Sequence, residues 1–283
     1  MIKILVAGAT GNTGSEIVKQ LLEKGIEFKA MSRKKSKGRT IAGVNWVDGD
    51  FADIGSLVSA FAGVKRIYIA MPAHPDNEAW INNAIIASKK AGVKHIIKLS
   101  GMGVSLDAGS EIIRVHARTD AMIMQSGLVY TLLRPNSFYQ NIFASIPTIK
   151  KQGAVYSVMS DSKLSFIDIR DVAAVAVKAL SETGHDNKTY NLTGPEALSY
   201  FNIVKKTGFF TGKDIALYPI SKNETKSAML KAGVSEWRAD KLSEILAWFA
   251  KGKYDAVTSD VESVLGRLPY SFNQFINEYK ERF

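Results

Sequence analysis

The sequence predicts an α/β protein built on a doubly wound parallel sheet, with a smaller, helix-rich C-terminal lobe. Three observations carry this prediction. Short apolar segments alternate with helix-length amphipathic segments through the first half of the chain, which is the pattern of strands joined by crossover helices. The first apolar segment runs directly into a glycine-rich turn and then a helix. The chain has 283 residues, of which 46% are hydrophobic, so it can bury the core that such a sheet requires.

The expected elements follow from this alternation and from the breakers at segment ends. Gly92 ends a helix, Pro72 stops a strand and Pro135 closes another. We expect the strand order 3-2-1-4-5-6, with a ligand at the carboxyl ends beside strands 1 and 4. The expected strands are 2–7, 28–32, 44–47, 66–71, 94–100 and 129–133, then 164–167 and 187–193. The expected helices are 15–24, 54–61, 77–91, 111–126, 138–150 and 170–181, with a polar hairpin at 154–163 and an amphipathic helix at 270–283.

The alternation of strands and helices loosens after Pro135, which predicts two domains. Residues 1–135 would form the nucleotide-binding domain, with its sheet completed by residues 164–195. Residues 136–163 and 196–283 would form the smaller lobe, which we expect to cover the substrate.

The turn after the first strand carries glycines at intervals of three residues. Gly8 permits a tight turn, Gly11 lets the backbone approach a pyrophosphate, and Gly14 lets the helix pack on the strand. The helix N-terminus adds N–H groups that bind phosphate. Although the spacing is Gly-x-x-Gly-x-x-Gly, the strand, the glycines and the helix together indicate a Rossmann-type dinucleotide site. The expected cofactor-binding residues of this turn are Gly8, Thr10, Gly11, Asn12, Thr13 and Gly14.

The end of the second strand indicates which dinucleotide is bound. An NAD site usually has an acidic residue there for the ribose 2′-hydroxyl, whereas a 2′-phosphate calls for arginine. This chain has Ser32 and Arg33 at that place, and no Asp or Glu between Glu27 and Asp48. We therefore expect NADP(H) in preference to NAD(H), with the basic stretch 33–39 adding positive charge. The alternative is that this stretch is only a solvated loop.

Composition excludes several other classes. The net charge of +10 would suit nucleic acid, but the basic stretch lacks interleaved aromatic residues and other lysines are scattered, so we expect no nucleic-acid partner. The chain has no cysteine, and its 4 histidines lack metal-binding spacing, so we expect no metal.

No apolar run reaches the roughly 18 residues of a membrane span. Because residue 2 already begins a strand, we expect a cytoplasmic protein without a signal peptide.

Several segments together resemble the NmrA-like branch of the atypical short-chain dehydrogenase/reductase superfamily, over essentially the whole chain. Besides the glycine turn, they are Gly49-Asp50-Phe51, Gly92-Val93-Lys94-His95-Ile96, residues 126–135 and residues 168–173. Residues 231–234 and 266–269 are similar to bacterial quinone and triphenylmethane-dye reductases.

The resemblance implies roles for residues at the strand ends. Asp50 and Phe51 would flank the adenine. The cofactor ribose would be lined by Ala70, Met71 and Pro72, and the nicotinamide side would be approached by Leu99, Ser100 and Gly101, with Pro135 nearby. Structural alternatives stay open, since Asp50 could cap the next helix and Pro72 could merely end a strand.

One departure from the family decides much of the chemistry. Typical short-chain dehydrogenases carry Tyr-x-x-x-Lys on the helix after strand 5, where the lysine lowers the pKa of the phenol. The corresponding helix here reads Val115-His116-Ala117-Arg118-Thr119-Asp120. Tyr218 to Lys222 matches the motif by chance, because Pro219 is incompatible with a helix interior. His116 is the candidate internal acid, the alternative being a hydrogen bond from its ring to the cofactor or to Asp120.

Residues after the sixth strand should open toward the reactive end of the cofactor. Aromatic side chains there suit a flat substrate, and they equally suit packing between lobes. The candidate substrate residues are His74, Met102, Asn136, Phe138, Tyr139 and Asn141.

Without the proton relay, alcohol dehydrogenation is disfavoured, whereas hydride donation to an electron-poor acceptor needs only proximity and orientation. The sequence therefore predicts an NADPH-dependent reductase of a quinone-like or other conjugated acceptor. The alternative is a non-catalytic NAD(P)-sensing regulator of the NmrA type that binds a protein partner. A nucleoside-diphosphate-sugar epimerase is less compatible, because the catalytic pair is missing. We expect a monomer or homodimer.

Overall fold

The structure is a computed structural model that describes residues 3–33 and 41–283. Ile2 of the first predicted strand and residues 34–39 of the basic stretch lie outside the described residues. Within the described chain, no helix is long and apolar enough to cross a membrane. The chain divides into two compact units, which are described separately. Unit 1 comprises residues 1–101, 115–134 and 169–190, and unit 2 comprises residues 102–114, 135–168 and 191–283.

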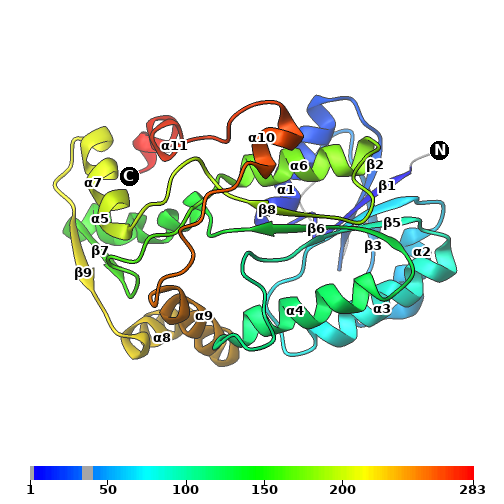
Figure 1. The fold of residues 1–283 in the computed structure, drawn as a ribbon, viewed down its shortest axis with the longest axis horizontal. Helices are drawn as coiled ribbons and strands as arrows, with labels where there is room; N and C mark the ends of the chain where they lie inside the picture. Colours follow the sequence, from blue (N-terminus) through cyan, green and yellow to red (C-terminus); the bar gives the residue numbers. More distant parts are fainter. Residues whose placement is uncertain (1–2, 34–40) are drawn as a thin grey trace. The chain divides into compact units, whose positions relative to one another are not determined.

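A seven-stranded sheet in the order β3-β2-β1-β4-β5-β6-β8 confirms the predicted α/β fold and the strand order 3-2-1-4-5-6 (Figure 1). Strands β1 to β6 pair in parallel, with Ala7 opposite both Met31 and Ile69. Their carboxyl ends therefore meet at one edge of the sheet. The strands are β1 (Ile4–Ala7), β2 (Phe28–Ser32), β3 (Asn45–Asp48), β4 (Arg66–Ile69), β5 (His95–Leu99), β6 (Val129–Pro135) and β8 (Lys188–Leu192).

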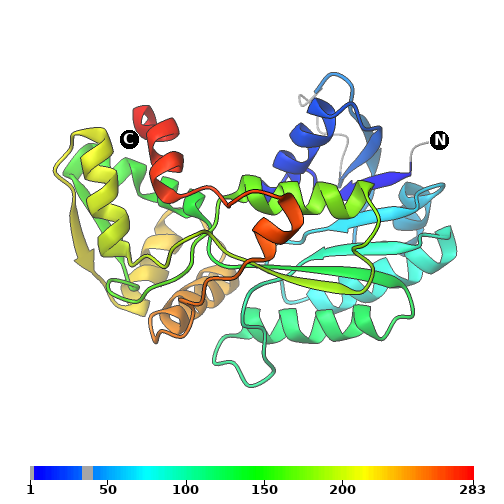
Figure 2. The same ribbon diagram turned by 45° about the horizontal axis from the view of Figure 1, so that its top comes forward.

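Helices cover both faces of this sheet. Helices α1 and α6 pack against one another on one face, while α2, α3 and α4 lie along the other (Figures 1 and 2). β1 is buried along its whole length, as expected for a central strand of a sheet covered on both sides. The core between the sheet, α2 and α3 includes Leu57, Phe61, Ile67 and Ile81. The helices are α1 (Asn12–Glu23), α2 (Ile54–Phe61), α3 (Asn77–Ala91), α4 (Glu111–Met124) and α6 (Ile169–Ser181).

Unit 2 is held by an aromatic core of its own. Tyr139 contacts Phe272 at 5.2 Å and Phe275 at 5.5 Å between ring centroids, with Phe143 next to Phe275. Three helices of this unit, α7, α8 and α11, begin with a capping box, in which a serine and a polar residue three positions later satisfy each other's backbone N–H groups. The elements are η1 (Tyr139–Ser145), α5 (Ile146–Gln152), β7 (Ala154–Ser157), α7 (Tyr200–Thr211), β9 (Ala216–Pro219), α8 (Lys222–Lys231), α9 (Glu236–Phe249), α10 (Asp260–Leu265), α11 (Phe272–Tyr279) and η2 (Lys280–Arg282).

The predicted hairpin at 154–163 is wrong. β7 pairs in parallel with β9, more than fifty residues later, so its partner could not be found by local pattern. The predicted strand at 164–167 is also wrong. Its backbone makes single bridges to different segments, Leu164 with Leu198 and with Tyr254, and Ile167 with Phe138. The predicted helix at 138–150 is a 3₁₀ helix followed by α5.

Candidate functional site

The glycine turn joins β1 to α1 at the carboxyl edge of the sheet. Gly8 has a φ of +87°, and a Cβ added there would lie 2.4 Å from the carbonyl oxygen of Ala70. A Cβ added at Gly14 would lie 2.1 Å from the carbonyl oxygen of Gly8. At Gly11 the nearest atom would be 3.3 Å away. Gly8 and Gly14 are thus required by the turn itself, while Gly11 stands at its exposed surface, where a ligand can approach.

Helix α1 begins three residues earlier than predicted, so its first turn is formed by part of the glycine motif. Its N-cap is Gly11, which has extended backbone (φ −80°, ψ 171°) and no side chain to satisfy the first N–H groups. Asn12, Thr13 and Gly14 therefore point backbone N–H groups toward the end of the helix, and the first turn contains no acidic residue. This end of α1 fits the phosphates of a dinucleotide.

Two predicted residues of the turn differ in exposure. Thr10 is exposed, whereas Thr13 is buried and its hydroxyl accepts a hydrogen bond from Tyr68 Oη at 2.9 Å. Burial raises the pKa of Tyr68 far above its usual value, so the phenol stays protonated and donates this bond. The Thr13 side chain therefore fixes α1 on β4, and only its backbone N–H faces the helix end.

The end of β2 places Ser32 half-buried and Arg33 exposed directly after it. The sheet also brings Asp48 opposite Ser32, because β2 and β3 pair in parallel. Asp48 is exposed. The sequence stretch between Glu27 and Asp48 contains no acid, yet the tertiary pairing puts one beside the predicted 2′-phosphate position, a neighbour that linear reasoning missed.

Asp50 and Phe51 follow β3. Asp50 Oδ1 accepts the Ala52 N–H at 2.9 Å, which closes a turn. The cap of α2 is Asp53, whose Oδ1 accepts the N–H groups of Gly55 and Ser56, so Asp50 does not cap that helix. Phe51 is half-buried against the unit 1 core.

The segment after β4 begins earlier than predicted, because β4 ends at Ile69 rather than at residue 71. Asn77 fixes its conformation by donating to the Pro72 carbonyl at 3.1 Å and accepting the His74 N–H at 2.9 Å. The His74 ring stacks on Trp80 at 4.3 Å, and its Nδ1 accepts the Asp76 N–H. Ala70 and Met71 are half-buried and Pro72 is exposed, so this segment forms an ordered wall beside the glycine turn.

A buried ionic cluster lies under the carboxyl ends of β5 and β6. Asp120 on α4 is 1% exposed and Lys98 on β5 is 4% exposed. Lys98 Nζ donates to Asp120 Oδ1 at 2.8 Å, while Ser100 Oγ and Arg134 Nη2 donate to Asp120 Oδ2 at 2.9 and 3.0 Å. Burial lowers the pKa of Lys98, and the adjacent Asp120 carboxylate opposes that change. Below, the term ionic cluster means Lys98, Asp120 and Arg134.

His116 lies next to Gly101 at the same edge, since a Cβ added at Gly101 would lie 3.5 Å from His116 Cδ2. Burial lowers the pKa of His116 from 6.5 to about 3, with Lys98 and Arg134 adding to the effect and Asp120 opposing it. The ring is therefore neutral at pH 7. The hydrogen bonds described for the Asp120 carboxylate come from Lys98, Ser100 and Arg134.

Sequence reasoning missed the ionic cluster, although one signal was present. Lys98 interrupts the apolar strand Ile96-Ile97-Lys98-Leu99, and a charged residue inside a buried parallel strand requires a partner. In the resemblance drawn from the sequence, Asp120 falls at the lysine position of the Tyr-x-x-x-Lys motif. Lys98 reaches the Asp120 carboxylate from β5.

In unit 2, the Asn136 side chain is used in hydrogen bonds within the protein. Its Nδ2 donates to Ser165 Oγ and to the Tyr254 carbonyl, both at 2.8 Å, and its Oδ1 accepts the Ser137 N–H. The Met102 N–H donates to the Pro135 carbonyl at 2.9 Å. Asn136 is 4% exposed, so its amide joins three segments of unit 2 and has little surface for a substrate.

The other candidate substrate residues of unit 2 have different surroundings. Tyr139 is 1% exposed within the aromatic core, so its assignment as a substrate residue is corrected: the ring packs on Phe272 and Phe275. Phe138 is half-buried, and Asn141 is exposed with its amide donating to Ser137 Oγ at 3.0 Å. Phe138 and Asn141 keep surface that a ligand can contact.

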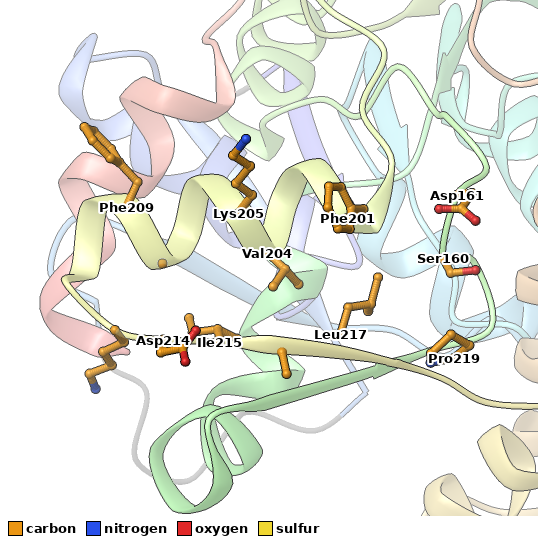
Figure 3. A pocket seen from close by; sticks show the side chains of 13 residues that line it. Ser160, Asp161, Phe201, Val204, Lys205, Phe209, Asp214, Ile215, Leu217 and Pro219 are labelled. Carbon is orange, nitrogen blue, oxygen red and sulfur yellow. The ribbon is translucent and has the colours of Figure 1, made fainter.

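A cavity of about 520 Å³ lies in unit 2 between α7 and β9 (Figure 3). Val204, Ile215 and Leu217 line its apolar part, with Phe201 and Phe209 on the α7 side. Its lining residues differ from every residue predicted for cofactor or substrate.

The parallel sheet, the glycine turn on an uncapped helix N-terminus and the ordered strand-end segments define a Rossmann-type dinucleotide-binding protein. Residues 8–183 match the family described as NAD(P)H-binding, and the chain belongs to this family. The predicted resemblance to NmrA-like atypical short-chain dehydrogenases/reductases is confirmed by this match and by the relatives that follow.

The relatives align over nearly the whole chain. The NAD(P)H azoreductase of Xenophilus azovorans is 33% identical over 282 residues, covering 99% of both chains. The solved structure of the NADPH-dependent quinone oxidoreductase QOR2 of Escherichia coli complexed with NADPH has a TM-score of 0.87 at 26% identity, covering 97% of this chain and 99% of that one. The triphenylmethane reductase of Citrobacter sp. complexed with NADP(H) has a TM-score of 0.84 at 27% identity, covering 98% and 99%.

Proposed function

We propose that this protein is an NADPH-dependent reductase that donates hydride to a quinone-like or other conjugated acceptor. The observation that carries the proposal is the composition of the α4 edge. In place of a Tyr-x-x-x-Lys relay, this edge carries a neutral His116 and an Asp120 that accepts hydrogen bonds from Lys98, Ser100 and Arg134. Such an edge can orient reactants, but it lacks the tyrosine acid that carbonyl reduction uses.

The cofactor fits the residues of unit 1. The N–H groups of Asn12 to Gly14 would hold the pyrophosphate, with Gly11 letting it approach. Ser32, Arg33, Asp50 and Phe51 would hold the adenosine end. Ala70, Met71 and Pro72 would line the ribose, and Leu99, Ser100 and Gly101 would face the nicotinamide. The bound dinucleotide supplies hydride, and water supplies the proton that completes the reduced acceptor.

Preference for NADP(H) rests on Arg33. Its exposed guanidinium directly follows β2 and can donate two parallel hydrogen bonds to a 2′-phosphate. Asp48 opposes this preference, because it stands opposite Ser32 and would repel a phosphate. Arg33 directly follows β2 along the chain, whereas Asp48 lies on the neighbouring strand β3. We therefore expect phosphate recognition to dominate, with Asp48 keeping some NAD(H) binding.

Residues of this chain would bind and orient the acceptor rather than protonate it. A conjugated acceptor delocalises the incoming electrons, so a proton from water can follow. His74 and Met102, together with Phe138 and Asn141, are the proposed substrate contacts. His116 would act as a neutral ring that can donate or accept one hydrogen bond beside Gly101.

The relatives support the same reaction class. The azoreductase, the quinone oxidoreductase and the triphenylmethane reductase are named for conjugated acceptors.

The test is a screen of NADPH oxidation with quinones, azo dyes, triphenylmethane dyes and simple aldehydes as acceptors. The loss of nicotinamide absorbance measures the oxidation. We expect acceptor-dependent oxidation with quinones or dyes and none with aldehydes. Reduction of aldehydes alone would contradict the mechanism. Tight NADPH binding with no oxidation by any acceptor would favour the regulatory alternative.

A further inference from the structure

The ionic cluster holds more positive than negative charge under the carboxyl ends of β5 and β6. Two cations, Lys98 and Arg134, share the single carboxylate of Asp120, which leaves one unit of positive charge. Lys98 and Asp120 are almost fully buried, so water screens this charge weakly. Ser100 donates to the same carboxylate and adds no charge.

The cluster lies directly beneath the segment proposed to face the nicotinamide. Ser100 belongs both to that segment and to the shell of Asp120, and its N–H is fixed by the Leu133 carbonyl at 2.7 Å. His116 lies beside Gly101 in the same surroundings. Burial is the main cause that lowers the pKa of its ring, while Lys98 and Arg134 add to that effect and Asp120 opposes it.

We propose that the excess charge of the ionic cluster makes Lys98 an electrostatic selector of the cofactor's redox state. The inference rests on the proposed function, because it takes the nicotinamide to lie at Leu99 to Gly101. The oxidised nicotinamide ring carries a positive charge that the reduced ring lacks. A buried positive charge nearby weakens binding of the oxidised form relative to the reduced form. It therefore favours loading of NADPH and release of NADP⁺, while hydride transfer from bound NADPH to the acceptor, which gains the two electrons, becomes less favourable.

The test compares binding of NADP⁺ and NADPH to the purified protein by calorimetry and fluorescence, with no acceptor present. We expect Lys98→Met to lower the ratio Kd(NADP⁺)/Kd(NADPH) by about tenfold, because it removes one weakly screened positive charge from the cluster. Lys90→Met removes the same charge from the exposed end of α3, and its ratio should match the wild type. General damage to the site would weaken both ligands equally and leave the ratio unchanged.

Arg134→Met provides a second variant if Lys98→Met does not fold, since the Arg134 side chain is 24% exposed. It should lower the ratio in the same direction. An unchanged ratio in both folded variants, or an equal fall in Lys90→Met, would overturn the inference. The acceptor screen reports separately on the proposed function, because the binding ratio needs no acceptor.

Discussion

Lys98 Nζ lies 2.8 Å from Asp120 Oδ1, in a pair that is closed off from solvent on both sides. Lys98 comes from the middle of a parallel strand and Asp120 from the helix that follows it. The pair connects the sheet to the edge where the substrate-facing residues are expected. Its two members are not equivalent, because Asp120 also receives Arg134 and Ser100.

Removal of Asp120 should therefore cost more stability than removal of Lys98. Asp120→Ala leaves two cations facing each other in the interior, and we expect a loss of about 3–5 kcal/mol in unfolding free energy. Lys98→Met leaves the carboxylate with Arg134 and Ser100 and should cost roughly 1–2 kcal/mol. Urea unfolding followed by circular dichroism measures both. Equal losses would show that Arg134 does not compensate.

The glycine turn separates structural from binding glycines. Gly14→Ala forces a Cβ to 2.1 Å from a backbone oxygen, so we expect loss of about 3 kcal/mol or more of stability. Gly11→Ala meets its nearest atom at 3.3 Å and should fold, but bind dinucleotide at least about tenfold more weakly. Thermal unfolding and NADPH titration distinguish the two. A fully stable Gly14→Ala protein would contradict the described packing of α1 on β1.

Arg33 should determine cofactor preference. Arg33→Ala removes a charge-assisted contact with the 2′-phosphate, so NADPH affinity should fall about tenfold to a hundredfold while NADH affinity stays the same. Asp48→Asn should act in the opposite direction and strengthen NADPH binding. Fluorescence titration of both cofactors is the measurement. Parallel changes for NADH and NADPH in Arg33→Ala would remove Arg33 from phosphate recognition.

Titration of His116 should produce no step near pH 6.5 in the dependence of kcat/KM on pH. Because burial and the ionic cluster lower its pKa to about 3, the ring is neutral across the range in which reductases are assayed. We therefore expect His116 to contribute no pH dependence to kcat/KM between about pH 5 and pH 7. His116→Gln keeps a neutral amide and should retain most turnover, and His116→Ala tests whether the ring is needed at all. A pH step near 6.5 that His116→Gln abolishes would show that the ring titrates during turnover.

His95 should make the protein less stable in acid. Thr131 Oγ1 donates to the His185 carbonyl, so it accepts from His95 Nε2 at 2.8 Å, which places a proton on that nitrogen. Burial lowers the pKa of His95 from 6.5 to about 4. The unfolded chain therefore binds one more proton between these values, and stability falls as pH falls through that window, by about 3 kcal/mol in all.

The measurement for His95 is urea unfolding at pH 7 and pH 4.5. His95→Gln should show a smaller acid loss than the wild type, because it cannot be protonated. His74→Gln is the matched control, since that ring is partly exposed and stacked on Trp80. An identical acid loss in wild type and His95→Gln would assign the effect to other groups.

The sequence by itself determined the order of the first six strands in the sheet and the glycine turn after the first of them. It also predicted that this turn belongs to a Rossmann-type dinucleotide site. These features depend on local signals, the alternation of apolar strands with helices and three glycines at fixed spacing. It also showed that the helix Glu111–Met124 contains neither tyrosine nor lysine, because that is a matter of which residues are present.

Only the tertiary structure decided which groups stand together. It paired β7 with β9, placed Asp48 opposite Ser32, buried Tyr139 in an aromatic core and joined Lys98 to Asp120. Each of these contacts links residues distant in sequence. The free energy of such a contact depends on burial and on the neighbouring charge, which local pattern does not contain.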